Sequence, residues 1–539
     1  MRGLMMDFPL TLVHVLERAG SVFGDIEIVS RRPDRRLSRY TYREFYHRAR
    51  KLARALELAG LKSGDRVGTL MWNHSSNFEC YFGIPVAGGV MHTLNLRLHP
   101  DELAYIANHG RDRFLIIDDV LLPIYESLRH KVPFERVICV PFGGSGAPAG
   151  MEDYETFLEE TDGEFDYPEI DENQAASMCF TSGTTGKPKG VVYSHRAQVL
   201  HSLSGCLSDC FALSNSDTVL PASSMFHANG WGVPYAAAIM GAKLVFPGPH
   251  LDPESLLDLI QKENVTLAFG VPTVWIGLLG ALEKNPSRWK PAKPLRIMCG
   301  GSAVPESLLR GLDRFGIRLF HLWGMTETAP IATLGVIKST LSNLSEDDKY
   351  RVRLKQGLPV PLVELRVMSG DRQAPWDGAT SGELEVRGPW VAADYLNSPE
   401  TRDRWSPDGW FRTGDIANID KDGYIKLVDR SKDLIKSGGE WISSVDLENA
   451  LMCHPCIREA AVIGVPHPKW QERPLAVVVR KEGAQVEPEE LLSFLAERFA
   501  KWQLPDAFVF ADEIPRTSVG KFLKMKLREQ YADWKWDAV

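Results

Sequence analysis

The sequence lacks several features that would assign it to common classes of protein. It has no run of about eighteen apolar residues, so no transmembrane helix is expected in the 539-residue chain. Its net charge of −8 provides no overall positive field for binding nucleic acid. The first apolar stretch is short and meets Asp7 and Pro9 early, which argues against a signal peptide. We therefore expect a cytoplasmic protein that does not bind nucleic acid.

The cysteines do not indicate a metal site. There are eight, they are scattered, and Cys453 and Cys456 have CxxC spacing. No second ligand pair stands nearby, and Leu451 and Ile457 flank the pair. A packed helix end is therefore favoured over a zinc site.

A loop rich in glycine, hydroxyl groups and lysine is the most informative segment. Residues 181–190 follow an apolar stretch, Ala175–Phe180, that we predict to be a strand. Glycines allow the backbone to approach closely, and N–H, hydroxyl and ammonium groups supply donors and positive charge, so this loop can surround a polyphosphate. It is not a Walker loop, because Thr181 stands where glycine is needed and Pro188 follows Lys187. An ordinary flexible loop is the alternative.

Further motifs follow this loop in a fixed order, at Trp323–Glu327, Gly382–Leu384, Thr413–Asp415, Asp429–Asp433 and Pro515–Lys521. With these motifs in this order and spacing, the chain resembles the adenylate-forming enzymes over nearly its full length. That superfamily includes acyl-CoA synthetases, firefly luciferase and the adenylation domains of peptide synthetases. The resemblance implies that a carboxylic acid reacts with ATP to give an acyl adenylate and pyrophosphate, and that a thiol then displaces AMP.

Length and hydrophobic pattern indicate an α/β protein with at least two domains. Continuous apolar runs separated by helical segments predict strands buried on both faces. Beyond about residue 350, strands such as 363–367 and 383–387 alternate apolar and charged residues, which predicts half-exposed antiparallel strands. The resemblance implies a large N-terminal domain over residues 1–431, with layered α/β sheets and a distorted β-barrel, and a small mobile α/β domain over residues 432–539.

Two helix starts can be read directly from the sequence. Thr41 and Glu44 have the spacing of a capping box, and Gly60 is expected to end the helix that they begin. Ser443 is expected to cap a helix in the C-terminal domain.

The resemblance assigns nucleotide binding to several segments. Asp415 is expected to accept hydrogen bonds from both ribose hydroxyls, because a carboxylate has two oxygens, with Arg430 beside the same ribose. Trp323 stands where tyrosine is usual; its ring is expected to stack on adenine, while the role of the phenol hydroxyl is lost. Glu327 and Thr184 are expected to bind Mg²⁺, which prefers oxygen ligands. The full nucleotide set is Thr181, Ser182, Gly183, Thr184, Thr185, Gly186, Lys187, Gly301, Ser302, Ala303, Trp323, Gly324, Met325, Thr326, Asp415, Arg430 and Trp441.

The resemblance also implies residues for the chemistry and for the acid. Lys521 is expected to bridge the carboxylate and the α-phosphate, the alternative being a solvated lysine near the chain end. His227 matches a residue that closes over the substrate carboxylate. Trp231 matches a tryptophan that gates the fatty-acyl tunnel in bacterial long-chain acyl-CoA synthetases, and a core aromatic is the alternative. The neighbouring glycines at 230 and 232 are expected to leave room for this ring to move.

The start of the small domain carries a third group of residues. Lys432 matches the hinge of the family, and Lys436 and Trp441 match a loop that enters the active site for the second step. Gly438 and Gly439 in this loop would let the pantetheine thiol of CoA pass close to the backbone.

The segments 433–444 and 467–474 resemble a dimeric, thermophile-type group of bacterial long-chain fatty-acyl-CoA synthetases, so a homodimer is expected. Residues 323–325 are closer to relatives that act on medium-chain acids and on 3-(methylthio)propanoate. A medium- to long-chain fatty acid is the expected substrate, with ATP, Mg²⁺ and CoA. Ligation of 3-(methylthio)propanoate and the loading of a carrier protein are the alternatives.

Overall fold

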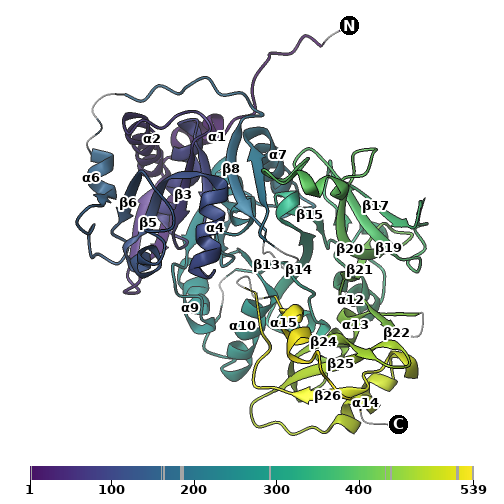
Figure 1. The fold of residues 1–539 in the computed structure, drawn as a ribbon. Helices are drawn as coiled ribbons and strands as arrows, with labels where there is room; N and C mark the ends of the chain where they lie inside the picture. The colour runs from purple at the N-terminus through teal and green to yellow at the C-terminus, as the bar shows by residue number, and fades with distance from the viewer. Residues whose placement is uncertain are drawn as a thin grey trace.

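The computed structural model describes residues 1, 3–159, 161, 164–181, 187–290, 293–430, 432–437, 440–517 and 521–536. They form a large N-terminal body and a smaller C-terminal body, which lies below it in Figure 1. The large body contains two mixed sheets and an antiparallel sheet, and the small body contains a further mixed sheet. Within the described ranges, no helix has both the length and the apolar character to span a bilayer.

The first sheet has nine strands, and its central strands run parallel from β14 to β1. Antiparallel strands complete it at both ends. In spatial order the strands are β16 (Leu358–Pro359), β15 (Ile331–Leu334), β14 (Ile317–Gly324), β13 (Leu295–Cys299), β12 (Leu267–Gly270), β10 (Thr218–Pro221), β11 (Lys243–Phe246), β1 (Glu27–Arg31) and β2 (Leu37–Thr41).

Both faces of this sheet are buried. Successive residues along its strands belong to two different hydrophobic cores. One core contains Ile28, Val219, Leu244 and Leu267, and the other contains Val29, Leu220, Val245 and Ala268. This alternation confirms the prediction from the continuous apolar runs, because a strand covered on both sides needs apolar residues at every position.

The second sheet has seven strands, all parallel to their neighbours except the last pair. In order they are β7 (Glu152–Asp153), β6 (Arg136–Val140), β5 (Asp112–Asp118), β3 (Arg66–Leu70), β4 (Val90–Thr93), β8 (Ala175–Phe180) and β9 (Gly190–Ser194). The predicted phosphate loop connects β8 and β9, and β8 has the bounds that the sequence predicted.

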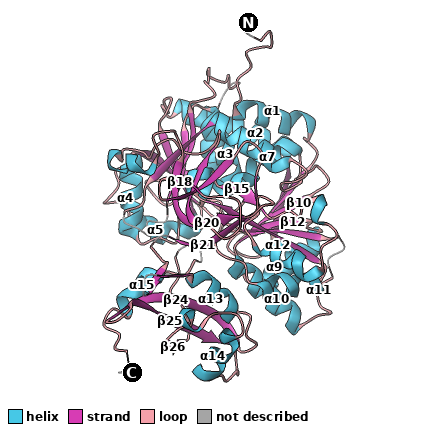
Figure 2. Ribbon diagram, turned by 90° about the vertical axis from the view of Figure 1, so that its right-hand side faces the viewer, coloured by secondary structure: helices cyan, strands magenta, loops and turns pink. Residues whose placement is uncertain are grey.

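Helices cover these sheets, as Figure 2 shows. The core shared by both sheets contains α1 (Leu12–Val22), α2 (Tyr42–Leu58), α3 (Ser75–Val86), α7 (His195–Cys206) and α8 (Val233–Met240). The outer cores contain α4 (Pro100–Gly110), α9 (Pro253–Glu263), α10 (Pro272–Lys284) and α11 (Glu306–Arg314). The remaining helices of this body are α5 (Leu122–Glu126), α6 (Tyr154–Glu159) and α12 (Glu346–Leu354).

The predicted capping box is present at the start of α2. The Thr41 hydroxyl accepts a hydrogen bond from the Glu44 N–H at 3.3 Å, and the Glu44 carboxylate accepts one from the Thr41 N–H at 2.6 Å. Two N–H groups that the helix itself leaves unpaired are thereby satisfied.

The third sheet is antiparallel and lies where the resemblance predicted a distorted barrel. Its strands follow an open order: β18 (Arg372–Gln373), β17 (Glu364–Ser369), β19 (Gly382–Arg387), β20 (Phe411–Ile419) and β21 (Ile425–Arg430). On β17, Leu365 and Val367 are buried while Glu364 is exposed, as expected for strands that alternate apolar and charged residues. The pattern fails on β19, where Glu385 is buried between Leu384 and Val386 because it pairs with Arg366.

The C-terminal body is a mixed sheet with three helices. The strands are β23 (Glu440–Ile442), β22 (Ile435–Ser437), β25 (Gln471–Arg480) and β24 (Ile457–His467), and β26 (Ala507–Phe510) pairs with β25. The helices are α13 (Ser444–Leu451), α14 (Pro488–Ala496) and α15 (Lys524–Gln530). Ser443 caps α13 as predicted, accepting a hydrogen bond from the Asp446 N–H at 3.1 Å.

Polar contacts join the two bodies next to residue 432. The Lys426 ammonium lies 2.9 Å from the Asp446 carboxylate, and the Ser444 N–H donates to the Asp429 carboxylate at 2.8 Å. The chain leaves the antiparallel sheet at Arg430 and joins the C-terminal sheet at Ile435. Lys432 lies between these points, and its role as a hinge stays a prediction.

Candidate active site

Two adjoining cavities lie where the C-terminal body meets the large body. The first has a volume of about 410 Å³, and of the predicted residues it is lined by Thr181, Lys187, His227, Trp231, Gly301, Gly324, Met325, Thr326, Glu327, Asp415, Arg430, Lys432 and Lys521. The second has a volume of about 200 Å³, and its lining adds Ser302, Ala303 and Trp323. Residues from motifs nearly 350 positions apart therefore meet in one place.

Asp415 is a buried carboxylate with partners on both oxygens. Its Oδ2 accepts a hydrogen bond from Trp323 Nε1 at 2.9 Å, and its Oδ1 lies 3.4 Å from Arg430 Nε. Asp415 and Arg430 are paired residues of neighbouring strands β20 and β21, which explains their juxtaposition. The carboxylate is thus fixed in orientation while each oxygen keeps a lone pair for a ligand.

Trp323 has a polar contact in addition to its predicted stacking on adenine. The sequence implied only that the role of the tyrosine hydroxyl is lost. The indole N–H donates to Asp415, and both side chains are buried, so tryptophan has a polar function of its own. Sequence reasoning missed this contact because the two residues lie 92 positions apart.

The motif at residues 382–384 supports the strand that carries Asp415. The Glu383 carboxylate accepts a hydrogen bond from the Gly414 N–H at 3.2 Å, and the Leu384 carbonyl accepts one from the Thr413 hydroxyl at 2.7 Å. The Thr413 hydroxyl in turn accepts one from the Asp415 N–H at 3.0 Å. This motif therefore positions Thr413–Asp415 through hydrogen bonds that each join a side chain to a main-chain group.

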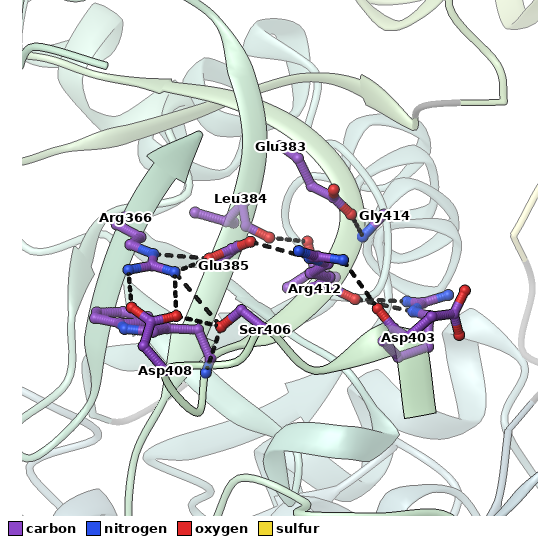
Figure 3. A network of polar contacts seen from close by, with 12 residues as sticks. Arg366, Glu383, Leu384, Glu385, Asp403, Ser406, Asp408, Arg412 and Gly414 are labelled. Carbon is purple, nitrogen blue, oxygen red and sulfur yellow. Dashed lines mark hydrogen bonds and ion pairs between the residues drawn. The ribbon is translucent and has the colours of Figure 1, made fainter. Parts of the chain in front are cut away.

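Figure 3 shows how these contacts continue into a wider network around β19 and β20. Glu385 lies 2.6 Å from the Arg366 guanidinium and 3.4 Å from Arg412 Nε. Arg366 also pairs with Asp408 at 2.6 Å, and Asp408 accepts a hydrogen bond from the Ser406 hydroxyl at 2.7 Å. The network ties the antiparallel sheet to the loop before β20 and stiffens the support of Asp415.

Lys521 reaches both cavities from the C-terminal body. A methyl group added to Gly301 would lie 3.8 Å from Lys521 Cε. Burial, and then the nearby Arg430, lower the pKa of Lys521 to about 8, against the opposing effects of Asp415 and Glu327. Its ammonium group is still largely charged at neutral pH, and it is poorly solvated. A freely solvated lysine, the alternative that the sequence left open, does not fit these surroundings.

The described parts of the motif around Lys521, residues 515–517 and 521–523, are hydrogen-bonded to each other. The Thr517 N–H donates to the Lys521 carbonyl at 2.7 Å, and the Lys521 N–H donates to the Thr517 hydroxyl at 3.1 Å. The Leu523 N–H also donates to the Pro515 carbonyl at 2.8 Å. Thr517 therefore holds the main chain of Lys521 through both its N–H and its hydroxyl.

Glu327 lies buried beside the first cavity, and its carboxylate accepts a hydrogen bond from the Tyr395 hydroxyl. The Lys189 ammonium lies over the Tyr395 ring, 5.4 Å from its centre. Lys187 and Lys189 also line this cavity. A buried carboxylate near these ammonium groups fits a Mg²⁺–phosphate group, since Mg²⁺ is commonly held by one or two carboxylates and by phosphate oxygens. Sequence reasoning missed Tyr395, which lies in none of the motifs.

His227 precedes an unusual turn, Ala228–Gly232, that carries Trp231. Burial, and secondly Lys521, lower the pKa of His227 to about 3, so its imidazole is neutral. Ala228, Asn229 and Trp231 have φ values of 36°, 34° and 60°. Such values are rare for residues other than glycine, and strain of this kind often accompanies functional sites.

The turn is held by the side chain of Asn229. Its Oδ1 accepts a hydrogen bond from the Ser177 hydroxyl at 2.8 Å, and its Nδ2 donates to the Thr93 hydroxyl at 3.1 Å. The glycines beside Trp231 lie where a side chain would be crowded, and the room for the Trp231 ring to move stays a prediction. A Cβ on Gly230 would lie 3.0 Å from the Tyr81 hydroxyl, and one on Gly232 would lie 2.5 Å from His201 Nδ1.

Some predicted residues lie elsewhere or outside the described residues. Lys436 lies on β22 and Trp441 on β23, and both are exposed. Neither residue lines the two cavities. The Lys436 ammonium lies 5.5 Å from the centre of the Trp441 ring. Within the loop before β9, Lys187 lies 5.2 Å from the Tyr105 ring centre. The predictions for Ser182, Gly183, Thr184, Thr185, Gly186, Gly438 and Gly439 fall outside the described residues.

Comparisons with known proteins agree with this geometry. The profile of the AMP-binding enzyme family matches residues 16–396, and that of the AMP-binding enzyme C-terminal domain matches residues 446–521. The chain is 51% identical to a long-chain-fatty-acid–CoA ligase of Thermus thermophilus, covering 98% of this chain and 97% of the relative. It is 43% identical to a medium-chain-fatty-acid–CoA ligase of Ectopseudomonas oleovorans, covering 99% and 98%.

A third relative is a 3-methylmercaptopropionyl-CoA ligase of Ruegeria lacuscaerulensis, which is 43% identical and covers 99% of both chains. Among solved structures, an anthranilate CoA ligase in complex with anthranoyl-AMP superposes with a TM-score of 0.87. It is 26% identical, and the match covers 97% of this chain and 98% of that one.

The contact between Trp323 and Asp415 leads to a prediction about nucleotide binding. Trp323→Phe keeps an apolar ring but removes the N–H, so Asp415 should be less well oriented toward a ribose. Hydrogen bonds to charged groups contribute about 1.5–3 kcal/mol, so the KM for ATP should rise about tenfold or more. The preference for ATP over 2′-deoxy-ATP should fall in the variant, measured as a ratio of kcat/KM.

Trp376→Phe, at a half-exposed tryptophan, is the control and should leave the ratio unchanged. An unaltered preference in Trp323→Phe would show that the indole N–H does not position Asp415 for the ribose.

Proposed function

The chain belongs to the family of AMP-binding enzymes, and on this basis we propose that it is an ATP-dependent acyl-CoA synthetase. It joins a carboxylic acid to CoA through an acyl adenylate and releases pyrophosphate and AMP. The observation that carries the proposal is that Lys521, from the C-terminal body, lines the same cavity as Asp415, Glu327 and His227.

In the first step a carboxylate oxygen attacks the α-phosphorus of ATP, and the bond to the pyrophosphate oxygen breaks. Two anions approach each other, so the protein must supply positive charge where negative charge develops. Lys521 supplies it as a partly desolvated ammonium group, whose effect is stronger than it would be in water. The neutral His227 contacts the carboxylate without adding a competing ion pair.

The remaining residues bind and orient the nucleotide. Asp415, held by Trp323 and Arg430, accepts the ribose hydroxyls, and the second cavity, with Ser302 and Ala303, receives the adenine. Glu327 holds Mg²⁺, which when bound neutralises phosphate charge. Fixing the reactants in this way lowers the entropic part of the barrier.

In the second step the CoA thiol attacks the acyl carbon, and AMP leaves. We assign this step to the face of the C-terminal body that carries Lys436 and Trp441, after rotation about Lys432, and Gly438 and Gly439, which lie between these two residues in the sequence, keep their predicted role toward the thiol. The observation that supports a second orientation is that Lys436 and Trp441 lie exposed, away from both cavities, while Lys521 lines them. No protein nucleophile is required, because the thiol itself attacks.

For the acid we propose a medium- to long-chain fatty acid admitted past Trp231. Trp231 lines the first cavity and sits on a strained turn, which suits a residue that moves between closed and open positions. The relatives that act on long- and medium-chain fatty acids support this substrate class. The 43% identity to a 3-methylmercaptopropionyl-CoA ligase favours 3-(methylthio)propanoate as the second candidate. We further propose a cytoplasmic homodimer.

The products distinguish this function from others that use ATP. Enzyme with Mg²⁺, ATP, octanoate and CoA should give AMP, pyrophosphate and octanoyl-CoA, measured by chromatography. Acids of other lengths and 3-(methylthio)propanoate complete the panel. An enzyme that loads a carrier protein would form adenylate but no CoA ester, and ADP as the nucleotide product would contradict the proposal.

The two faces of the C-terminal body should separate the half-reactions. Lys521→Ala should slow adenylate formation by about 10²-fold, because a desolvated charge that acts in the transition state is lost. It should spare thioester formation from a synthetic acyl adenylate, and Lys436→Ala should do the reverse. Lys469→Ala removes another exposed lysine, 4.7 Å from a tryptophan ring centre, and serves as the control. Equal loss of both half-reactions in Lys521→Ala would contradict the assignment.

The pKa of Lys521 predicts a pH dependence. Because the pKa is lowered to about 8, the ammonium group loses its proton as the pH rises through 8. The kcat/KM for adenylate formation should then fall about tenfold per pH unit above that value. Lys521→Arg should have a lower kcat/KM for adenylate formation, and this value should not change between pH 7 and 9.5, since the guanidinium group stays charged. The same decline in both proteins would show that another group titrates.

A further inference from the structure

A buried histidine behind the Trp231 turn has an unsatisfied N–H group. His201 lies on α7 and is 3% exposed. Its Nε2 accepts a hydrogen bond from the Ile331 N–H at 3.3 Å, and burial lowers its pKa to about 3. The ring is therefore neutral, and the proton resides on Nδ1. Among the described residues Nδ1 has no hydrogen-bond partner.

A small cavity, of about 10 Å³, adjoins this ring. Its walls include His201, Ser204, Ile331, Val360 and Trp390. The Trp390 indole is satisfied by the Ile331 carbonyl at 3.1 Å. The Ser204 hydroxyl, by contrast, has no hydrogen-bond partner among the described residues.

The thiol of Cys210 is the polar neighbour of this hydroxyl. Burial raises the pKa of Cys210 to about 11, and Ser204 opposes that rise. A thiol is a weak hydrogen-bonding group, so Ser204 retains a strong donor and acceptor for something else. Two polar groups thus border a cavity whose other walls are mainly apolar.

This cavity is separated from the proposed acid site by a single layer of residues. Ile331 lines both the small cavity and the cavity that contains Lys521. On the other side, a Cβ on Gly232 would lie 2.5 Å from His201 Nδ1, so the donor directly abuts the turn that carries Trp231. Ile331 and the turn therefore lie between the polar groups and the proposed acid site.

We propose that His201, with Ser204, forms a polar end of the acid pocket that recognises a hydrogen-bond acceptor within the acyl chain. The inference rests on the proposed function and refines its substrate class. The acceptor is an ether, hydroxyl or carbonyl oxygen, or more weakly a thioether sulfur. A purely hydrocarbon tail leaves the imidazole N–H unpaired, and a site built to form a hydrogen bond discriminates strongly against a ligand that lacks the partner.

The test uses acids of equal length in which one methylene is replaced by oxygen or by sulfur at successive positions. The kcat/KM of each is compared with that of the all-carbon acid, by AMP release with CoA present. We expect one position at which oxygen improves kcat/KM about tenfold over its neighbours and sulfur improves it less. A merely structural role for His201 would produce no dependence on position.

His201→Phe should abolish this positional advantage while the all-carbon acid still reacts, and Ser204→Ala should reduce it. His195→Phe is the matched control. His195 is also a buried histidine on α7, one ring nitrogen accepts the Leu12 N–H at 3.2 Å, and the other has no partner among the described residues. It lines none of the cavities described above.

The outcomes separate this proposal from the proposed function. AMP release with every acid but no favoured position would overturn the heteroatom site, and the cavity would then hold only a water molecule. A positional advantage that survives His201→Phe would overturn it as well. If no acid of any kind gives AMP, the proposed function itself fails. If His201→Phe does not fold, the scan of oxygen and sulfur positions with the wild-type enzyme and with Ser204→Ala still tests the proposal.

Discussion

The orientation of the buried Asp415 carboxylate is the constraint on which the site depends. Its oxygens face Trp323 from the end of β14 and Arg430 from β21, so the carboxylate joins the nine-stranded sheet to the antiparallel sheet. The same carboxylate opposes the fall in the pKa of Lys521, which arrives from the C-terminal body. Three parts of the fold thereby meet at one negative charge. A carboxylate held from both sides can bind a ligand without first being reoriented.

Burial of the Lys521 ammonium group makes it effective in the proposed reaction. A lysine in water would be fully solvated, and its attraction to a developing negative charge would be weak. In the cavity Lys521 is desolvated enough to lower its pKa, yet Asp415 and Glu327 keep it largely protonated. The balance between desolvation and nearby carboxylates produces a cation that remains charged at neutral pH and interacts strongly.

The turn that carries Trp231 combines strain with firm support. Residues in sparsely populated backbone regions cost about 1–3 kcal/mol each, so neighbouring structure must offset them. Asn229 provides part of this support through Ser177 and Thr93, and His201 fills the space beside Gly232. Glycine is required at 232 because a side chain there would collide with the imidazole. A turn supported in this way can hold one position firmly and still change to another when a ligand favours it.

Much of the local structure was determined by the sequence itself. The capping box at Thr41 and the bounds of β8 follow from helix-capping chemistry and hydrophobic pattern, which act over a few residues. The cap and the strand were predictable because each depends on neighbours in the chain. The ordered motifs also named Lys187, Lys521, Glu327 and Asp415, which line one cavity in the structure.

The tertiary structure alone decided how these residues act on one another. The indole N–H of Trp323 donates to Asp415, which lies 92 residues away in the sequence, and Glu327 accepts a hydrogen bond from Tyr395, 68 residues away. His201 lies against Gly232 and Ile331. It also decided that a side chain at position 230 or 232 would meet Tyr81 or His201. Such contacts depend on how sheets and helices pack, and the periodicity of a single segment carries no information about the partner that it will meet.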